Sequence, residues 1–202
     1  MSVRILLTAL CVAIAGYCAS AAGSADSFDP YTANIEENIA TPSVPAKAHD
    51  AVAETMSALT RSLRKAGYTV EGVRGGEVTM VTIPVSALFQ PNSTALKDNG
   101  YAKLQPLVAY VSQTGKYKTI LAVHADDTGD ETYAEELTTD RANAIDGYFA
   151  DKLGGESPII PYGLGFDEPV APNTGVKNRE KNRRIEFYFV PTAEYISTIR
   201  KK

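Results

Sequence analysis

The segment Thr119–Ala125, with the sequence TILAVHA, limits the possible folds more than any other part of the chain. A nearly continuous apolar run, without alternating polar positions, is typical of a strand buried inside a domain. Such a strand needs neighbouring strands and a covering layer. A chain of 202 residues has room for one ordinary domain with flanking segments, so the other elements of the same domain must supply both.

Before this run, the sequence predicts one helix and a β-hairpin. Apolar residues at helical spacing predict a helix over residues 46–68, and Gly67 is a suitable residue to end it. Two extended segments, Thr69–Val73 and Glu77–Pro84, flank the turn Arg74–Gly76 and predict the hairpin. The apolar stripe of the helix consists of Val52, Met56, Leu59 and Leu63.

The rest of the chain predicts two further helices and two further strands. The first helix has an apolar face that includes Leu104 and Val111, and Pro106 inside it predicts a late start or a kink. The second helix is expected from about Thr138 to Leu153. The remaining extended segments are 159–163 and Arg184–Val190. This order, β-β-α-β-α-β-β preceded by an N-terminal helix, predicts an α+β two-layer sandwich with helices on one face of a mixed sheet.

Residues 1–21 are typical of a signal peptide. Arg4 precedes an apolar run of 13 residues, and Ala19–Ala21 has the small-x-small pattern of a cleavage site. The run is too short to span a bilayer comfortably. We therefore expect an exported protein whose mature chain begins after residue 21 and has no thiol, because both Cys11 and Cys18 lie in the leader. The alternative is lipid attachment at Cys18, which would tether the chain to a membrane.

The rest of the chain is expected to divide into a linker, a main domain and a tail. Residues 22–45 are small, polar and rich in proline, which predicts a flexible linker. Residues 193–202 are expected to form a basic C-terminal tail, and residues 69–192 are expected to form the main domain. The net charge of −4 gives no electrostatic support to a nucleic-acid partner.

Two charged residues stand in unusual places after the apolar strand. Asp126 follows the strand directly, and Arg141 would be the third residue of a helix capped by Thr138. The helix dipole disfavours an arginine there by about 0.3–1 kcal/mol, unless an external anion binds the guanidinium and the free N–H groups. A carboxylate that binds a cation and a guanidinium that binds an anion would together bind a zwitterion, such as the free end of an amino acid. The alternative is a surface salt bridge between the two residues, worth about 0–1 kcal/mol.

Four ordered segments resemble the motifs of OmpA-like C-terminal domains of the OmpA and MotB type. The segment from His124 to Ala142 resembles the motif G-H-T-D-x-x-G followed by L-S-x-x-R-A, with the aspartate and arginine 15 positions apart. Any one motif alone would be weak, but the order and spacing make the resemblance specific over residues 70–191. The other segments are Leu88–Leu96 (LFQPNSTAL), Gly163–Pro169 (GLGFDEP) with Asn173, and Asn178–Glu186 (NREKNRRIE).

The resemblance implies a β-α-β-α-β-β fold and a non-catalytic domain that binds the peptidoglycan stem peptide, and we expect no cofactor. In such domains an aspartate holds the ammonium group of diaminopimelate and an arginine holds its carboxylate. Those roles fall to Asp126 and Arg141, while Asn92, Leu137 and Arg184 would line the groove. The resemblance also implies a location in the periplasm, or on the periplasmic face of the outer membrane, where the chain would anchor an envelope component to the wall.

Three residues depart from the family pattern, and other functions stay open. Val123 and Ala125 replace a glycine and a threonine, and Ala134 replaces an asparagine, which predicts weaker or altered peptide recognition. One alternative is a domain that binds a periplasmic protein, through this fold or through the helix over 46–68. A hydrolase using Asp126 and His124 is disfavoured because no Ser or Cys nucleophile motif accompanies them. A metal site around His124 fits neither zinc nor EF-hand spacing.

Overall fold

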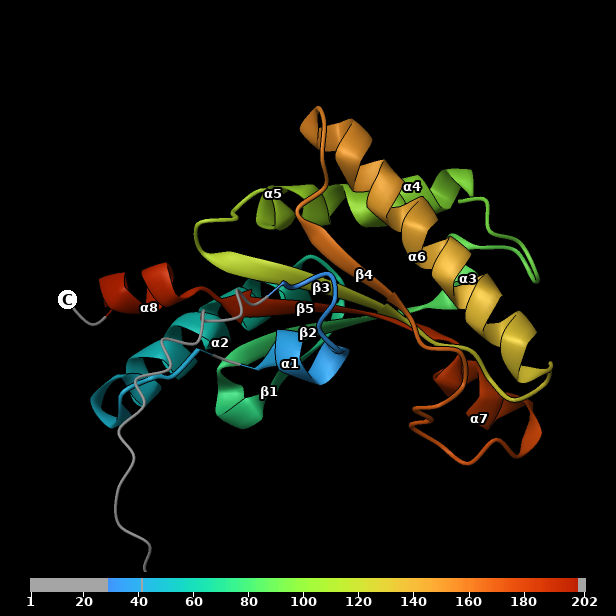
Figure 1. The fold of residues 1–202 in the computed structure, drawn as a ribbon, viewed down its shortest axis with the longest axis horizontal. Helices are drawn as coiled ribbons and strands as arrows, with labels where there is room; N and C mark the ends of the chain where they lie inside the picture. Colours follow the sequence, from blue (N-terminus) through green and yellow to red (C-terminus); the bar gives the residue numbers. More distant parts are fainter. Residues whose placement is uncertain (1–28, 41, 200–202) are drawn as a thin grey trace, which may run out of the picture.

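A five-stranded mixed sheet forms the centre of the computed structural model, which describes residues 29–40 and 42–199 (Figure 1). The strand order is β1-β2-β5-β3-β4. The hairpin strands are antiparallel, β5 is antiparallel to both β2 and β3, and β3 is parallel to β4. The strands are β1 (Thr69–Val73), β2 (Val78–Pro84), β3 (Tyr117–Val123), β4 (Ile159–Gly163) and β5 (Arg184–Pro191).

Helices pack on one face of this sheet and form the main core with it. The predicted stripe of the N-terminal helix is buried there, and Val52 and Leu63 are completely inaccessible. Ile145 and Phe149 of the longest helix meet Phe187 of the central strand β5 in the same core. The predicted α+β sandwich is therefore confirmed. The helices on this face are α2 (His49–Lys65), α3 (Val85–Leu88), α4 (Asp98–Leu104), α5 (Val108–Val111) and α6 (Glu131–Leu153).

The proline in the predicted middle helix has the expected effect. A 3₁₀ turn, Gln105–Leu107, separates α4 from α5, and Pro106 lies inside it. Proline has no N–H to donate and its ring clashes with the preceding turn, so a continuous α-helix cannot pass through this position.

A helix that the sequence did not predict covers the other face of the sheet. Helix α1 (Ile35–Ile39) lies in the range 22–45, where a linker was expected. Asn34 and Glu37 form a capping box at its start. Ile35 and Ile39 pack on a second apolar cluster that includes Ile120 and Val190. The helix escaped prediction because a single pair of apolar residues is too short to show a period.

The start of α6 differs from its prediction. The helix begins at Glu131 rather than near Thr138, and Asp130 is its N-cap, accepting a hydrogen bond of 2.9 Å from the Tyr133 N–H. The prediction was wrong because the first two turns are mostly exposed and polar, so they show little apolar period. Arg141 consequently lies well inside the helix, and the helix-dipole argument does not apply to it.

Two short helices complete the C-terminal part. Helix α7 (Gly175–Asn182) precedes β5, and α8 (Ala193–Ile199) occupies most of the range expected to be a tail. Ile196 of α8 is buried in the main core, so the predicted tail is a packed helix as far as residue 199. No helix in the described ranges 29–40 and 42–199 has the length and apolarity needed to cross a membrane. The predicted leader, with Cys11 and Cys18, lies outside the described residues.

Candidate functional site

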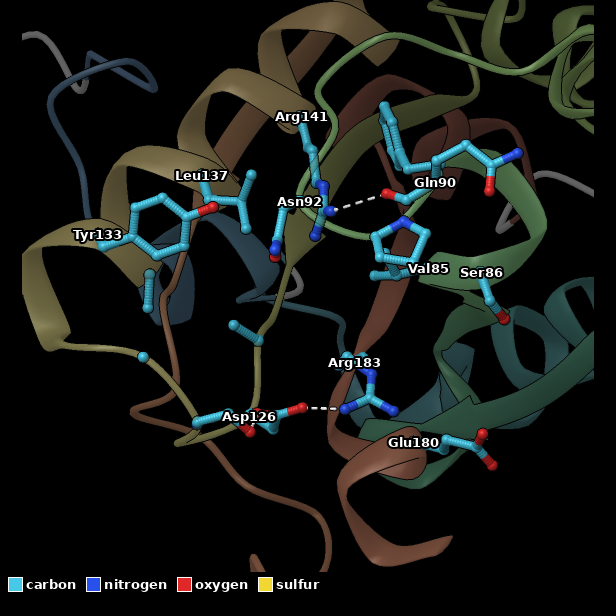
Figure 2. A pocket seen from close by; sticks show the side chains of 16 residues that line it. Val85, Ser86, Gln90, Asn92, Asp126, Tyr133, Leu137, Arg141, Glu180 and Arg183 are labelled. Atoms are coloured by element: carbon cyan, nitrogen blue, oxygen red, sulfur yellow. Dashed lines mark hydrogen bonds and ion pairs between the residues drawn. The ribbon is translucent and has the colours of Figure 1, made fainter. Parts of the chain in front are cut away.

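A cavity of about 460 Å³ opens where β3 ends, between the loop after α3 and the first half of α6 (Figure 2). Four of the five predicted site residues line it: Asn92, Asp126, Leu137 and Arg141. They come from three separate segments of the chain, and the fold brings them together. The fifth predicted residue, Arg184, is not part of this cavity.

Asp126 is held at the end of β3 by its neighbours. The Thr128 N–H donates to Asp126 Oδ1 at 2.9 Å, and the Thr128 hydroxyl donates to the same oxygen. The Arg183 guanidinium donates to Oδ2. The residue is 7% exposed. Burial by itself would raise the pKa of Asp126, but the hydrogen bonds from Thr128 and Arg183 outweigh it and lower the pKa below its usual value.

Arg141 brings a buried positive charge to the opposite side of the cavity. Its Nε donates to the Ser93 carbonyl at 2.9 Å, and its Nη2 donates to the Gln90 carbonyl at 3.4 Å. The guanidinium also lies 5.2 Å from the centre of the Phe89 ring, within the range of a cation–π contact. Arg141 is only 4% exposed, and burial lowers its pKa. Within the described part of the chain, no carboxylate lies at ion-pair distance from it.

The direct salt bridge that the sequence left open is not formed. Asp126 is paired with Arg183, whereas Arg141 is bound to carbonyl oxygens. Both side chains line the same cavity, which therefore carries a guanidinium at one side and a carboxylate at the other.

A row of side chains on α6 forms one wall. Tyr133, Leu137 and Arg141 are four residues apart, so they lie on the same helical face, and all three line the cavity. The Tyr133 side chain is 44% exposed. Sequence reasoning missed Tyr133 because the helix was expected to begin after it. Its spacing from Leu137 would have identified it once the true helix start was known.

The opposite wall is the loop after α3. Asn92 has a φ of 54°, in the left-handed region that asparagine tolerates better than most residues. The isolated bridge between Phe89 and Leu96 closes the base of this loop. The conformation of Asn92 thus allows the chain to turn tightly beside the cavity, while the carbonyls of the same loop position Arg141.

Arg184 lies outside the cavity, in a buried polar cluster with Glu186, Tyr188 and His124. Its Nε donates to Glu186 at 2.6 Å, and the Tyr188 hydroxyl donates to Glu186 at 2.6 Å. His124 Nε2 lies 3.2 Å from Glu186 and is buried, as expected of a structural residue at the end of a strand. Successive side chains along a strand point to opposite faces, so Arg183, one residue earlier, lines the cavity instead.

Helix α7 is fixed in place beside the cavity. Asn182 is fully buried and its amide oxygen accepts from the Val170 and Ala171 N–H groups, both at 3.0 Å. Its amide nitrogen donates to the Ala171 carbonyl at 2.8 Å, so Asn182 braces the loop that precedes α7. On the exposed side, Arg179 pairs with Asp127 at 3.2 Å.

No metal cluster accompanies these groups. Among residues 29–40 and 42–199, no three His, Cys, Asp or Glu side chains are placed to hold a metal ion together. The cavity is lined by charged and hydrogen-bonding side chains, among which the pKa of Asp126 and the pKa of Arg141 are both lowered.

Comparison with protein families matches residues 88–183 to the model of the OmpA family. Outer membrane porin F of Pseudomonas aeruginosa is 29% identical over 108 residues, which are 53% of this chain and 31% of the porin. The putative lipoprotein YfiB of Escherichia coli is 31% identical over 101 residues, which are 48% of this chain and 62% of YfiB. The chain thus spans less than two thirds of either relative.

Two solved structures share this fold. A putative MotB-like protein from Desulfovibrio vulgaris superimposes with a TM-score of 0.61 at 21% identity, covering 72% of this chain and 96% of that one. The cell wall anchor of the T6SS from Pseudomonas aeruginosa superimposes with a TM-score of 0.56 at 22% identity, covering 66% and 94%. At these identities the likeness establishes the fold alone.

Proposed function

We propose that the protein is a non-catalytic module that anchors an envelope component to peptidoglycan, because residues 88–183 match the model of the OmpA family. The charges that face the cavity support the proposal, and so does the fold that the chain shares with a cell wall anchor. The curated relatives include an outer membrane porin and a putative lipoprotein. They support a location in the periplasm or at the outer membrane; lipid attachment at Cys18 stays a prediction.

The ligand that we propose is the zwitterionic end of diaminopimelate in the stem peptide. The single observation that carries this is Arg141, a 4% exposed guanidinium with carbonyl acceptors and no carboxylate among its described neighbours. A buried charge without a counter-charge is costly, and a ligand carboxylate would compensate it. The ligand ammonium group would then bind to Asp126 across the cavity. Leu137 and Tyr133 would contact the aliphatic part between them.

The departures from the family pattern affect this site unequally. Val123 is fully buried in the main core, so the side chain that replaces a glycine is not a cavity group. Ala125 and Ala134 do line the cavity and offer no polar atoms on their side chains. Two charge-assisted contacts contribute about 1.5–3 kcal/mol each, so we expect micromolar to millimolar affinity for one stem peptide.

The alternatives have less structural support. The apolar stripe of α2 is buried in the core, so it offers no free face to a protein partner. His124 lies in the cluster with Glu186 rather than in the cavity, so it cannot act with Asp126 on a common substrate. Ligand binding in the cavity is therefore the function that a defined set of side chains supports.

Co-sedimentation with intact sacculi tests the proposal directly. Residues 22–202 should pellet with the sacculi, and free meso-diaminopimelate should release them. Asp126→Ala and Arg141→Ala, each checked for folding by circular dichroism, should lower the bound fraction at least about tenfold, the loss of one charge-assisted contact.

Asp127→Ala is the matched control for that experiment. Asp127 carries the same charge, is adjacent in sequence, and, among the described residues, pairs with the exposed Arg179. It should pellet like the parent, because exposed pairs contribute little. Failure of the parent to pellet, or equal losses for Asp126→Ala and Asp127→Ala, would overturn the proposed site.

A further inference from the structure

We infer that Arg183 is a specificity-determining residue of this site, because it already occupies the carboxylate that a ligand ammonium group must reach. This inference rests on the proposed function and adds that Arg183 competes with the ligand ammonium group for Asp126. Arg183 donates to Asp126 Oδ2, and Figure 2 shows its guanidinium directed at that carboxylate. The resemblance to known domains assigned the second arginine of the pair, Arg184, to the groove, whereas the structure assigns the first.

The hydrogen bonds of Asp126 leave little room for a second cation. A carboxylate has about four lone-pair positions. Oδ1 accepts from both the N–H and the hydroxyl of Thr128, and Oδ2 accepts from Arg183. An ammonium group could add to the remaining position of Oδ2 only by lying next to the Arg183 charge. Like charges at that distance repel, so the ligand gains full access only when Arg183 moves away.

The position of Arg183 allows its side chain to move while its backbone stays fixed. Its N–H donates to the Arg179 carbonyl at 3.0 Å, and its carbonyl accepts from the Val85 N–H at 3.0 Å. Its side chain is 38% exposed, in contrast to 6% for Asp126. The Arg183 side chain can therefore rotate toward solvent without disturbing the junction between α7 and β5.

Glu180 provides a second acceptor for the displaced guanidinium. It lines the same cavity, and it precedes Arg183 by three residues at the end of α7, the spacing at which helical side chains meet. Binding of a ligand ammonium group thus becomes an exchange: the ammonium takes Asp126, and Arg183 turns to Glu180 or to water. The cost of that exchange lowers affinity for ligands that carry an ammonium group, but not for ligands that have only carboxylates.

Calorimetric titration with meso-diaminopimelate and with pimelate separates these cases. Arg183→Met keeps the length of the side chain and removes its charge, and it should bind meso-diaminopimelate about three- to tenfold more tightly than the parent. Pimelate, which has the two carboxylates and no ammonium group, should bind parent and variant more nearly alike. Glu180→Gln should weaken binding of meso-diaminopimelate in the parent, and should have no effect in the Arg183→Met background, because no guanidinium then needs a second acceptor.

Arg179→Met is the matched control. Arg179 carries the same charge on the same helix but pairs with Asp127 and does not line the cavity. If it tightened binding as much as Arg183→Met, the gain would come from net charge and the inference would be wrong. Thermal unfolding verifies that each variant is folded, and Arg183→Gln replaces Arg183→Met if the latter is not.

The outcomes separate this inference from the proposed function. If the parent binds and Arg183→Met binds equally or more weakly, Arg183 is a ligand contact or a bystander; the inference fails and the anchor function stands. If only Arg183→Met binds, the inference holds and the natural chain is self-blocked, which overturns the proposed function. If neither variant nor parent binds, both fail.

Discussion

Glu186 is a buried carboxylate whose neighbours keep it ionised. It accepts hydrogen bonds from Tyr188 and Arg184, and His124 Nε2 lies 3.2 Å away. Burial alone would raise its pKa, but the hydrogen bonds from His124 and Tyr188, with the charge of Arg184, lower the pKa to about 2. The buried polar cluster on this face of the sheet therefore contains Glu186 in its ionised form.

Acid should remove the contribution of this cluster to stability. The pKa of Glu186 is lower in the folded chain than its ordinary value of 4.5. The stabilisation is therefore complete above pH 4.5 and is lost as the pH falls toward 2, amounting to on the order of 3 kcal/mol. Urea unfolding at several pH values measures it. Glu186→Gln cannot ionise, so its free energy of unfolding should change less over this range than that of the parent; parallel curves would contradict the assignment.

Helix α6 and strand β4 approach each other closely at one glycine. A Cβ atom on Gly163 would lie 2.3 Å from the Thr139 backbone nitrogen and 2.5 Å from the Thr139 Cα. Backbone atoms cannot yield as a flexible side chain would. The Gly165 N–H also donates to the Thr138 hydroxyl at 3.0 Å, so the segment after β4 is bonded to the same turn of the helix. This contact sets the distance of the cavity wall on α6 from the sheet.

Gly163→Ala should therefore push α6 away from β4. We expect the free energy of unfolding to fall by about 1–3 kcal/mol or more, as for other overpacked interiors. Gly147→Ala is a control on the same helix: its Cβ would meet no atom within 4 Å, and alanine is the better helix former by about 0.5–1 kcal/mol. Chemical denaturation of both variants should give shifts of opposite sign; a neutral Gly163→Ala would mean that the two elements separate readily.

Sequence patterns predicted the elements that carry a clear apolar period and failed where the period is absent. The stripe of α2 shows a helical period, and β3 is a continuous apolar run buried on both faces, so their residues reveal them. The first turns of α6 and the single turn of α1 have too few buried apolar residues.

The error of one residue at Arg184 has a different cause. Almost every residue of β5, whichever face it lies on, is buried, so no contrast of polar and apolar positions shows which of two adjacent arginines points to the cavity. Asp126 stood out because it directly follows an apolar strand, whereas the placement argument for Arg141 rested on a helix start that the structure does not have.

The two faces of the sheet have separate roles (Figure 1). One face of the sheet carries the main core and, at the ends of the strands, the cavity. The other face is covered by the segment around α1, which is bonded to β4 as well as packed on it. Asn38 is fully buried; it donates to the Tyr162 hydroxyl at 2.5 Å and to the Pro30 carbonyl at 2.6 Å. The Tyr162 hydroxyl in turn donates to the Ala33 carbonyl at 2.7 Å.

Removing the Asn38 side chain should loosen this cover without changing the cavity. Asn38→Ala leaves buried partners unsatisfied, so the free energy of unfolding should fall by about 1–3 kcal/mol, and the amides of β4 should exchange their hydrogens faster. Glu36→Gln, which removes only the exposed partner of Arg74, should change neither. The bound fraction in sacculus sedimentation should equal that of the parent for both variants, because no residue of α1 lines the cavity. Reduced sedimentation of folded Asn38→Ala would mean instead that the two faces are coupled through β3 and β4, and that docking of the N-terminal segment is part of ligand binding.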